Sequence, residues 1–189
     1  FWGSEPNPGI DNDSRITIVL EDLVSGNGGY FAAANGYPKQ IFSDSNEREM
    51  IFINIQAGNL AKIFLAHEFQ HLISQNQKEL LRKVQEDVWL NELRSEYSVS
   101  LLGYNDNYYN SSLENRVRAF LEKPSDSLTE WPNVSSDYAQ VVLFGQYLSE
   151  QFGQSIFKET LLSPMIGIDS INQFLQLHNY PYKFSNVFE

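Results

Sequence analysis

The sequence predicts an α+β fold in which a small β-sheet comes first and a set of helices follows. Short segments rich in Ile, Val and Thr precede residue 56, whereas helix start and stop signals dominate from residue 60 onward. The 189 residues are 42% hydrophobic and 14% aromatic, a composition typical of a folded globular chain. We therefore expect a single domain, residues 1–189, with a sheet-bearing lobe at 1–80, an all-helical lobe at 81–189 and a cleft between them.

Three strands are predicted in the first lobe. The opening residues are rich in Pro, Gly, Asn and Asp, which predicts an entering loop over residues 1–14. Asp11 and Asp13 superficially resemble the start of a calcium loop, but the glycine and the distal glutamate of such a loop are missing, so a polar turn is favoured and calcium has no support. The strands are expected at residues 15–23, 30–34 and 49–55.

Helices follow the last strand. Asn59 can cap the first free amides of a helix that runs over residues 60–78. A charged segment, residues 78–87, leads to the next helix, which stops at Gly103. From that point the helices are expected at residues 88–102, 113–121, 136–152, 155–162 and 169–178.

Composition narrows the class of function. The formal net charge is −11 and Lys plus Arg number only 13, so binding to the phosphate backbone of a nucleic acid is not expected. The sequence contains no run of about eighteen apolar residues, so no membrane-spanning helix is predicted. Without cysteine, any metal ligand must be a histidine or a carboxylate. The chain begins at Phe1 rather than Met, which leads us to expect a fragment of a longer precursor.

The helix at residues 60–78 carries His67, Glu68 and His71, an H-E-x-x-H pattern. Side chains four residues apart share a helix face, so the two imidazoles can grip one metal ion. Glu68 points about 100° further round, where it can take a proton from a metal-bound water but cannot be a third ligand. The neighbouring residues are apolar almost all round the helix, which predicts burial, and buried polar groups need a partner such as a metal.

Catalytic zinc needs a third protein ligand. Glu92 and Glu96 lie four residues apart on the helix at residues 88–102, among apolar neighbours that predict partial burial of at least one carboxylate. We favour Glu92 as the third ligand.

These residues resemble the gluzincin branch of the zinc metallopeptidases, in which H-E-x-x-H is followed about twenty residues later by N-E-x-x-S-D or W-L-N-E. The chain reads A-H-E-F-Q-H-L-I and then W-L-N-E, and it is most similar to bacterial hyicolysin-type peptidases over about residues 51–152. The resemblance implies a zincin-like fold in which His67, His71 and Glu92 bind one catalytic Zn²⁺ and Glu68 is the general base. It also implies that Glu96, which stands where the thermolysin pattern has Asp, orients a histidine.

The same resemblance suggests a tyrosine on a downstream helix as the donor to the oxyanion of the transition state. Tyr138 is the first candidate and Tyr147 the second; the alternative is that each simply packs a helix face. His178 resembles no position of the family, so a surface or core role is favoured.

We therefore predict a zinc endopeptidase acting on peptide or protein substrates, secreted or at a bacterial cell surface. An extended substrate would add to an exposed strand edge at residues 30–34 or just after them. Two alternatives stay open: a module that keeps the fold for binding or adhesion without turnover, and a zinc hydrolase of a non-peptide bond. The sequence carries no indication of the oligomeric state.

Overall fold

The computed structural model describes residues 1–24 and 26–186. Its sheet has three strands in these residues, in the order β1-β3-β2. β3 runs parallel to β1 and antiparallel to β2, so β2 forms one edge of the sheet. The strands are β1 (Thr17–Glu21), β2 (Gly29–Phe31) and β3 (Met50–Asn54), each at a predicted position. Strand β2 is shorter than expected because Ala33 and Ala34 turn into a 3-10 helix, Ala33–Gly36.

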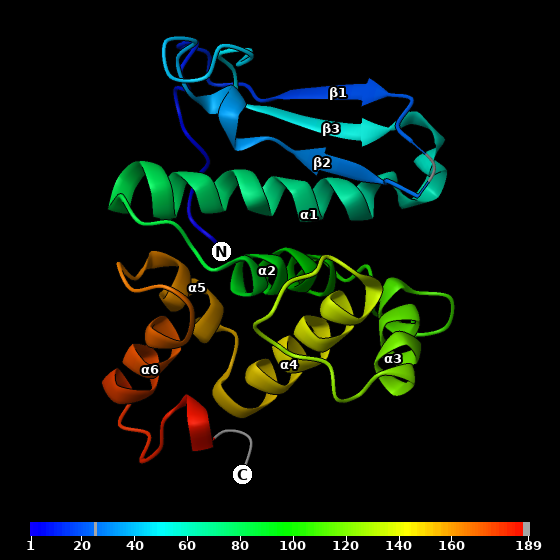
Figure 1. The fold of residues 1–189 in the computed structure, drawn as a ribbon, viewed down its shortest axis with the longest axis vertical. Helices are drawn as coiled ribbons and strands as arrows, with labels where there is room; N and C mark the ends of the chain where they lie inside the picture. Colours follow the sequence, from blue (N-terminus) through cyan, green and yellow to red (C-terminus); the bar gives the residue numbers. More distant parts are fainter. Residues whose placement is uncertain (25, 187–189) are drawn as a thin grey trace.

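Helix α1 (Ala61–Ser74) runs along one face of the sheet, beside β2 and β3 (Figure 1). It continues without a break into a π-helix, Gln75–Leu80, where we expected the end of an α-helix and the start of a charged linker. The expected cap at Asn59 is wrong: α1 has no side-chain cap, because a 3-10 helix, Ile55–Leu60, delivers the chain into it. That 3-10 helix is capped by Asn54, which accepts a hydrogen bond from the backbone N–H of Gln56.

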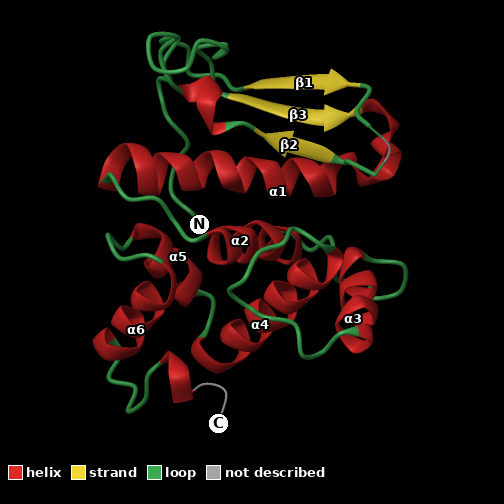
Figure 2. Cartoon of the chain, viewed as in Figure 1, coloured by secondary structure: helices red, strands yellow, loops and turns green. Residues whose placement is uncertain are grey.

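The second half of the described chain is helical, as predicted, and lies on the other side of α1 from the sheet (Figure 2). Helix α2 ends next to Gly103 and α4 ends at Gly153, and both glycines adopt the positive φ that favours glycine at a helix C-terminus. The elements are α2 (Val88–Leu101), α3 (Ser112–Glu122), α4 (Ser135–Phe152), α5 (Ser155–Leu162), α6 (Gly167–Leu177) and a 3-10 turn, Phe184–Asn186.

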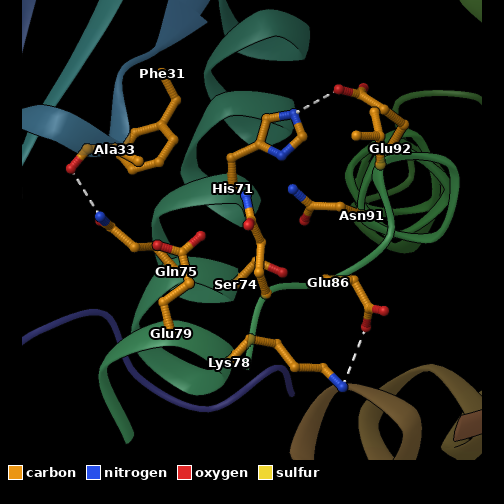
Figure 3. Close-up of a pocket in the computed structure, with 12 residues that line it drawn as sticks. Phe31, Ala33, His71, Ser74, Gln75, Lys78, Glu79, Glu86, Asn91 and Glu92 are labelled. Atoms are coloured by element: carbon orange, nitrogen blue, oxygen red, sulfur yellow. Dashed lines mark hydrogen bonds and ion pairs between the residues drawn. The ribbon is translucent and has the colours of Figure 1, made fainter. Parts of the chain in front are cut away.

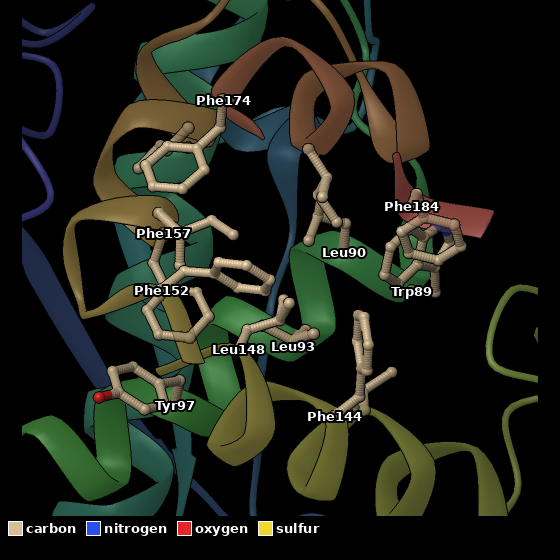
Figure 4. Close-up of a cluster of buried hydrophobic side chains, with 14 of the residues drawn as sticks. Trp89, Leu90, Leu93, Tyr97, Phe144, Leu148, Phe152, Phe157, Phe174 and Phe184 are labelled. Atoms are coloured by element: carbon tan, nitrogen blue, oxygen red, sulfur yellow. The ribbon is translucent and has the colours of Figure 1, made fainter. Parts of the chain in front are cut away.

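Two apolar clusters hold the layers together. Between the sheet and α1, the fully buried Ile51 packs with Ile53 and Leu72. The larger cluster lies among the helices, where Trp89 and Leu93 of α2 meet residues of α4, α5 and α6 (Figure 4). Helix α2 packs against both α1 and α4 and is therefore held rigidly against the helix that carries the H-E-x-x-H pattern.

The α+β class with a small sheet and a helical second half is confirmed. In the part of the chain that the structure describes, no helix combines the length and the apolar character needed to cross a membrane.

Candidate metal centre

His67 and His71 lie one turn apart on α1 and point the same way, as their spacing predicts. Their Nε2 atoms are 3.1 Å apart, and the two rings meet edge to face with centroids separated by 4.8 Å. Two imidazole nitrogens that converge on one point can supply two of the ligands of a metal site.

Glu92 on α2 supplies the third group. Its Oε2 lies 3.2 Å from His67 Nε2, and its Oε1 lies 3.5 Å from His71 Nε2. Tetrahedral zinc with bonds of about 2.0–2.1 Å requires ligand atoms about 3.3 Å apart, so this triangle has the size that zinc needs. Glu92 Oε2 is also buried without a well-aligned hydrogen bond despite its closeness to His67, which fits a group that awaits a cation.

The charges around the triangle favour a cation. Burial alone would lower the pKa of His67, but Glu92, Glu96 and Glu68 surround the ring and raise its pKa to about 9. Burial would likewise raise the pKa of Glu92, yet the two histidines hold it well below its usual range. Three carboxylates thus share a small partly buried space with two imidazoles, and a divalent ion would neutralise them better than a proton on His67.

Polar side chains face the outward nitrogens of both rings. Glu96 Oε1 lies 3.6 Å from His67 Nδ1, which is within ion-pair distance but longer than a hydrogen bond. Ser95 Oγ lies 3.1 Å from His71 Nδ1 and donates to Gln70 at 2.7 Å. Ser95 stands at the serine of the N-E-x-x-S-D pattern, but we assigned it no role from the sequence, although its position three residues after Glu92 places it on the same helix face.

Arg116 of α3 is a second group that the sequence reasoning missed. Its Nη2 donates to Glu96 Oε1 at 2.6 Å and its Nε to Oε2 at 3.3 Å, so the carboxylate beside His67 is itself held from two sides. No motif or spacing marks Arg116, since only the packing of α3 against α4 brings it to this place.

Glu68 lies beside strand β2, with only 8% of its surface exposed. Its carboxylate accepts a hydrogen bond from the backbone N–H of Phe31, and burial raises its pKa. Gly29 of β2 lies close to both β3 and Glu68: a Cβ there would clash with the carbonyl oxygen of Phe52 at 2.7 Å and would only touch Cγ of Glu68 at 3.4 Å. A buried carboxylate with a raised pKa is suited to accept and return a proton.

Tyr138 of α4 lines a cavity of about 380 Å³ together with His67 and Glu68. Its hydroxyl donates to Asn133 Oδ1 at 2.9 Å, and the guanidinium of Arg116 lies 4.7 Å from the centre of its ring. Burial raises the pKa of Tyr138, so the phenol keeps its proton and remains a donor.

The other sequence candidates lie elsewhere. Tyr147 stacks on Phe144 and does not line the cavity that holds Tyr138. His178 pairs with Glu159 at 2.8 Å on the exposed surface, one of the two roles that the sequence favoured. Asp13 pairs with the exposed Arg15, and Asp11 accepts a hydrogen bond from the backbone N–H of Asp13, as in a polar turn. Among the described residues, the one cluster that could hold a metal ion is His67, His71 and Glu92.

A second cavity, of about 240 Å³, opens on the other side of the triangle, beside His71 and Glu92 (Figure 3). Phe31 and Ala33 form the wall on the side of the sheet. The free edge of β2 therefore passes both cavities: Gly29 borders the cavity near Glu68, and Phe31 borders the cavity near His71.

No family model matches this chain. The chain is 30% identical, over an alignment of 203 residues, to the neutral metalloprotease ShpI of Staphylococcus hyicus. The alignment covers 91% of this chain and 44% of that protein, so the chain spans less than half the length of this relative. With the His67–His71–Glu92 cluster in place, this similarity over nine-tenths of the chain confirms the resemblance to the zinc metallopeptidases that the sequence motifs predict.

Proposed function

We propose that this chain is the catalytic domain of a zinc endopeptidase that cleaves peptide bonds by hydrolysis. The observation that carries the proposal is the convergence of two imidazole nitrogens and one carboxylate next to a buried, otherwise unused glutamate. His67, His71 and Glu92 would hold the zinc ion. When bound there, zinc polarises the scissile carbonyl and acidifies a water molecule.

Glu68 acts as the general base in this proposal. It takes a proton from the attacking water and later passes it to the nitrogen of the leaving amine. Its burial supports this role, because a carboxylate with a raised pKa is a stronger base and takes a proton from water more readily. The hydrogen bond from Phe31 fixes the carboxylate on the side of the cavity that Tyr138 also lines.

Tyr138 is the proposed donor to the oxyanion. Its ring is held by Arg116, and its single hydroxyl proton, which it gives to Asn133 Oδ1, would turn to the substrate oxygen when negative charge develops there. Glu96 keeps the ring of His67 in its orientation, and Arg116 keeps Glu96 in place.

The substrate would bind as an extended strand along the edge of β2 that faces away from β3. The relative is named a protease, which favours a peptide over another hydrolysable bond. A module that binds without turnover is disfavoured by Glu68, since binding alone does not need a base.

The test compares the wild-type protein with Glu68→Gln. Metal analysis of both proteins should find close to one zinc per chain, and only the wild type should hydrolyse casein, with loss of cleavage after chelation and recovery on adding zinc. Glu150→Gln, an exposed change on α4, is the matched control and should cleave like the wild type. Zinc-loaded wild type that leaves casein intact would favour the binding module, and cleavage that survives in Glu68→Gln would remove that residue from its role.

A further inference from the structure

The cavity beside His71 and Glu92 has the size of a subsite for one side chain. Its volume of about 240 Å³ is below the roughly 300–1,000 Å³ of pockets that hold whole small molecules. It opens directly onto the triangle and is bordered by the free edge of β2 (Figure 3). A residue next to the scissile bond would therefore place its side chain there.

Two charged groups in the lining are already fully occupied. The Nζ atom of Lys78 donates to the backbone carbonyls of Thr160, Ser163 and Met165 at 2.6 to 3.0 Å and lies 3.1 Å from Glu86. Glu86 also accepts from Gly167 and from Arg94, an arginine that is buried behind it and does not line the cavity. This pair therefore closes one end of the cavity and has no donor left for a ligand.

Two buried oxygens of the lining have no hydrogen-bond partner. They are Oγ of Ser74, a hydroxyl that can donate or accept, and Oδ1 of Asn91, which only accepts. Glu79 accepts one hydrogen bond, from the hydroxyl of Tyr37 to Oε2 at 2.9 Å. Buried polar atoms without partners in a cavity indicate a missing ligand group, and Asn91 Oδ1 and the carboxylate of Glu79 both suit a ligand that donates.

Glu79 lies on the same face of its helix as His71. His71, Ser74, Gln75, Lys78 and Glu79 follow the i, i+3, i+4, i+7, i+8 spacing of one helix face, and all of them line the cavity. The last three belong to the π-helix Gln75–Leu80, and single π-turns of this kind occur often at functional sites.

The position of Glu68 sets the direction of the substrate. Glu68 must reach the leaving nitrogen, and it lines the cavity near Tyr138 but not the cavity near Glu79. The leaving half of the peptide therefore lies toward Gly29, and the acyl half lies toward Phe31 and Ala33. A substrate in this direction runs antiparallel to β2, which is a pairing that a strand edge accepts.

We propose that the cavity lined by Ser74, Glu79 and Asn91 selects an arginine or lysine side chain on the N-terminal side of the scissile bond, with Glu79 as the residue that sets the preference. This inference rests on the proposed peptidase function. A guanidinium or ammonium group supplies donors to the free oxygens and a positive charge opposite the carboxylate of Glu79, whose partner Tyr37 is uncharged.

The experiment uses matched peptides that differ only at the residue before the scissile bond: arginine, its neutral isostere citrulline, and norleucine. The wild type should cleave the arginine peptide about tenfold to 100-fold faster, in kcat/KM, than the citrulline peptide, as expected for a hydrogen bond to a charged group. Glu79→Gln should reduce this ratio to near one, whereas Glu150→Gln should keep it. Equal cleavage of arginine and citrulline peptides by the wild type, or an unchanged ratio in Glu79→Gln, would overturn the assignment.

A binding measurement separates this inference from the peptidase function. Zinc-loaded Glu68→Gln should bind the arginine peptide more tightly than the citrulline peptide, and the difference should vanish in the double variant with Glu79→Gln. If the wild type cuts none of the peptides and leaves casein intact, the peptidase function is wrong. The binding measurement still tests the proposed preference of the cavity. If Glu68→Gln binds the arginine and citrulline peptides equally, that preference is wrong, whatever the catalytic result.

Discussion

The imidazole of His67 has a carboxylate at each of its nitrogens. Glu92 lies 3.2 Å from Nε2, on the side where a metal would bind, and Glu96 lies 3.6 Å from Nδ1 on the opposite side. Arg116 holds Glu96 at 2.6 Å, so the outer carboxylate is fixed before any ligand arrives. Such outer partners set the tautomer and the orientation of a metal-binding ring, and their loss weakens metal binding without removing a ligand.

The two glutamates should therefore differ in the size of their effect. Glu92→Ala should abolish zinc binding, because two histidines alone do not complete a site, whereas Glu96→Ala should weaken zinc binding by about 10- to 100-fold. Competition with a coloured chelator measures both affinities. Glu122→Ala, an exposed change at the end of α3, should bind zinc like the wild type. The assignment of the two roles fails if Glu96→Ala loses more affinity than Glu92→Ala.

Tyr138 and Tyr147 can be compared in the same way as the two glutamates. Removing the hydroxyl in Tyr138→Phe should lower kcat by about 100-fold with little change in KM, since the hydroxyl is proposed to act only on the developing oxyanion. Tyr147→Phe should leave both constants unchanged, because that ring stacks on Phe144 outside the cavity. Steady-state kinetics on one peptide measure both variants. Full turnover by Tyr138→Phe would remove the residue from the mechanism.

How much of the site could be predicted depends on how far apart its parts lie in the sequence. His67 and His71 lie on one helix at a spacing that helical periodicity converts directly into geometry. Glu92 was predicted from its apolar neighbours and from the resemblance, and the structure brings the three together. Arg116 could not be predicted, since its place depends on how α3 packs on α4, which no local spacing encodes. Tyr138 was singled out from a resemblance, and the structure places it in the cavity without testing its role.

At the scale of the elements, helix and strand positions followed from local pattern, and their ends did not. Asn59 has the chemistry of a cap, but Asn54 caps the preceding 3-10 helix instead, because the chain turns one segment earlier than the pattern suggested. Strand β2 ends at Phe31 rather than residue 34 because the next residues enter a 3-10 helix. A 3-10 helix of a few residues is too short to show a repeating pattern of apolar residues, so such a pattern does not reveal it.

The π-helix after α1 shows how distant contacts override local preference. Residues 75–80 read as the end of an α-helix, yet Lys78 is drawn into three backbone carbonyls more than eighty residues further along the chain. Burial lowers the pKa of Lys78 to about 8, while Glu86 acts in the opposite direction. The contacts of this buried ammonium anchor the π-helix to the helical half, and Lys78 and Glu79 of the π-helix both line the cavity beside the triangle.

For the molecule as a whole, the site lies where its two halves meet. Leu72 of α1 packs in the apolar cluster beneath the sheet, and Ile73 of α1 packs in the larger cluster among the helices. Trp89 and Leu93 of α2 belong to that larger cluster as well. The triangle joins α1 to α2, so a bound ion would link the two halves directly. Glu92 is the only one of the three groups that is far from the others in sequence, and the complete triangle therefore exists only in the folded chain.

Zinc should consequently stabilise the whole fold. An ion that binds the folded chain and not the unfolded one raises the free energy of unfolding by about 2.7 kcal/mol when its free concentration is 100 times its dissociation constant. Urea unfolding followed by the fluorescence of the buried Trp89 should show a higher midpoint with zinc than after chelation, with the same increase in Glu68→Gln, which keeps all three ligands. In Glu92→Ala the increase should disappear. Equal midpoints of the wild type with zinc and with chelator, or an increase that persists in Glu92→Ala, would show that the triangle does not hold the ion that links α1 to α2.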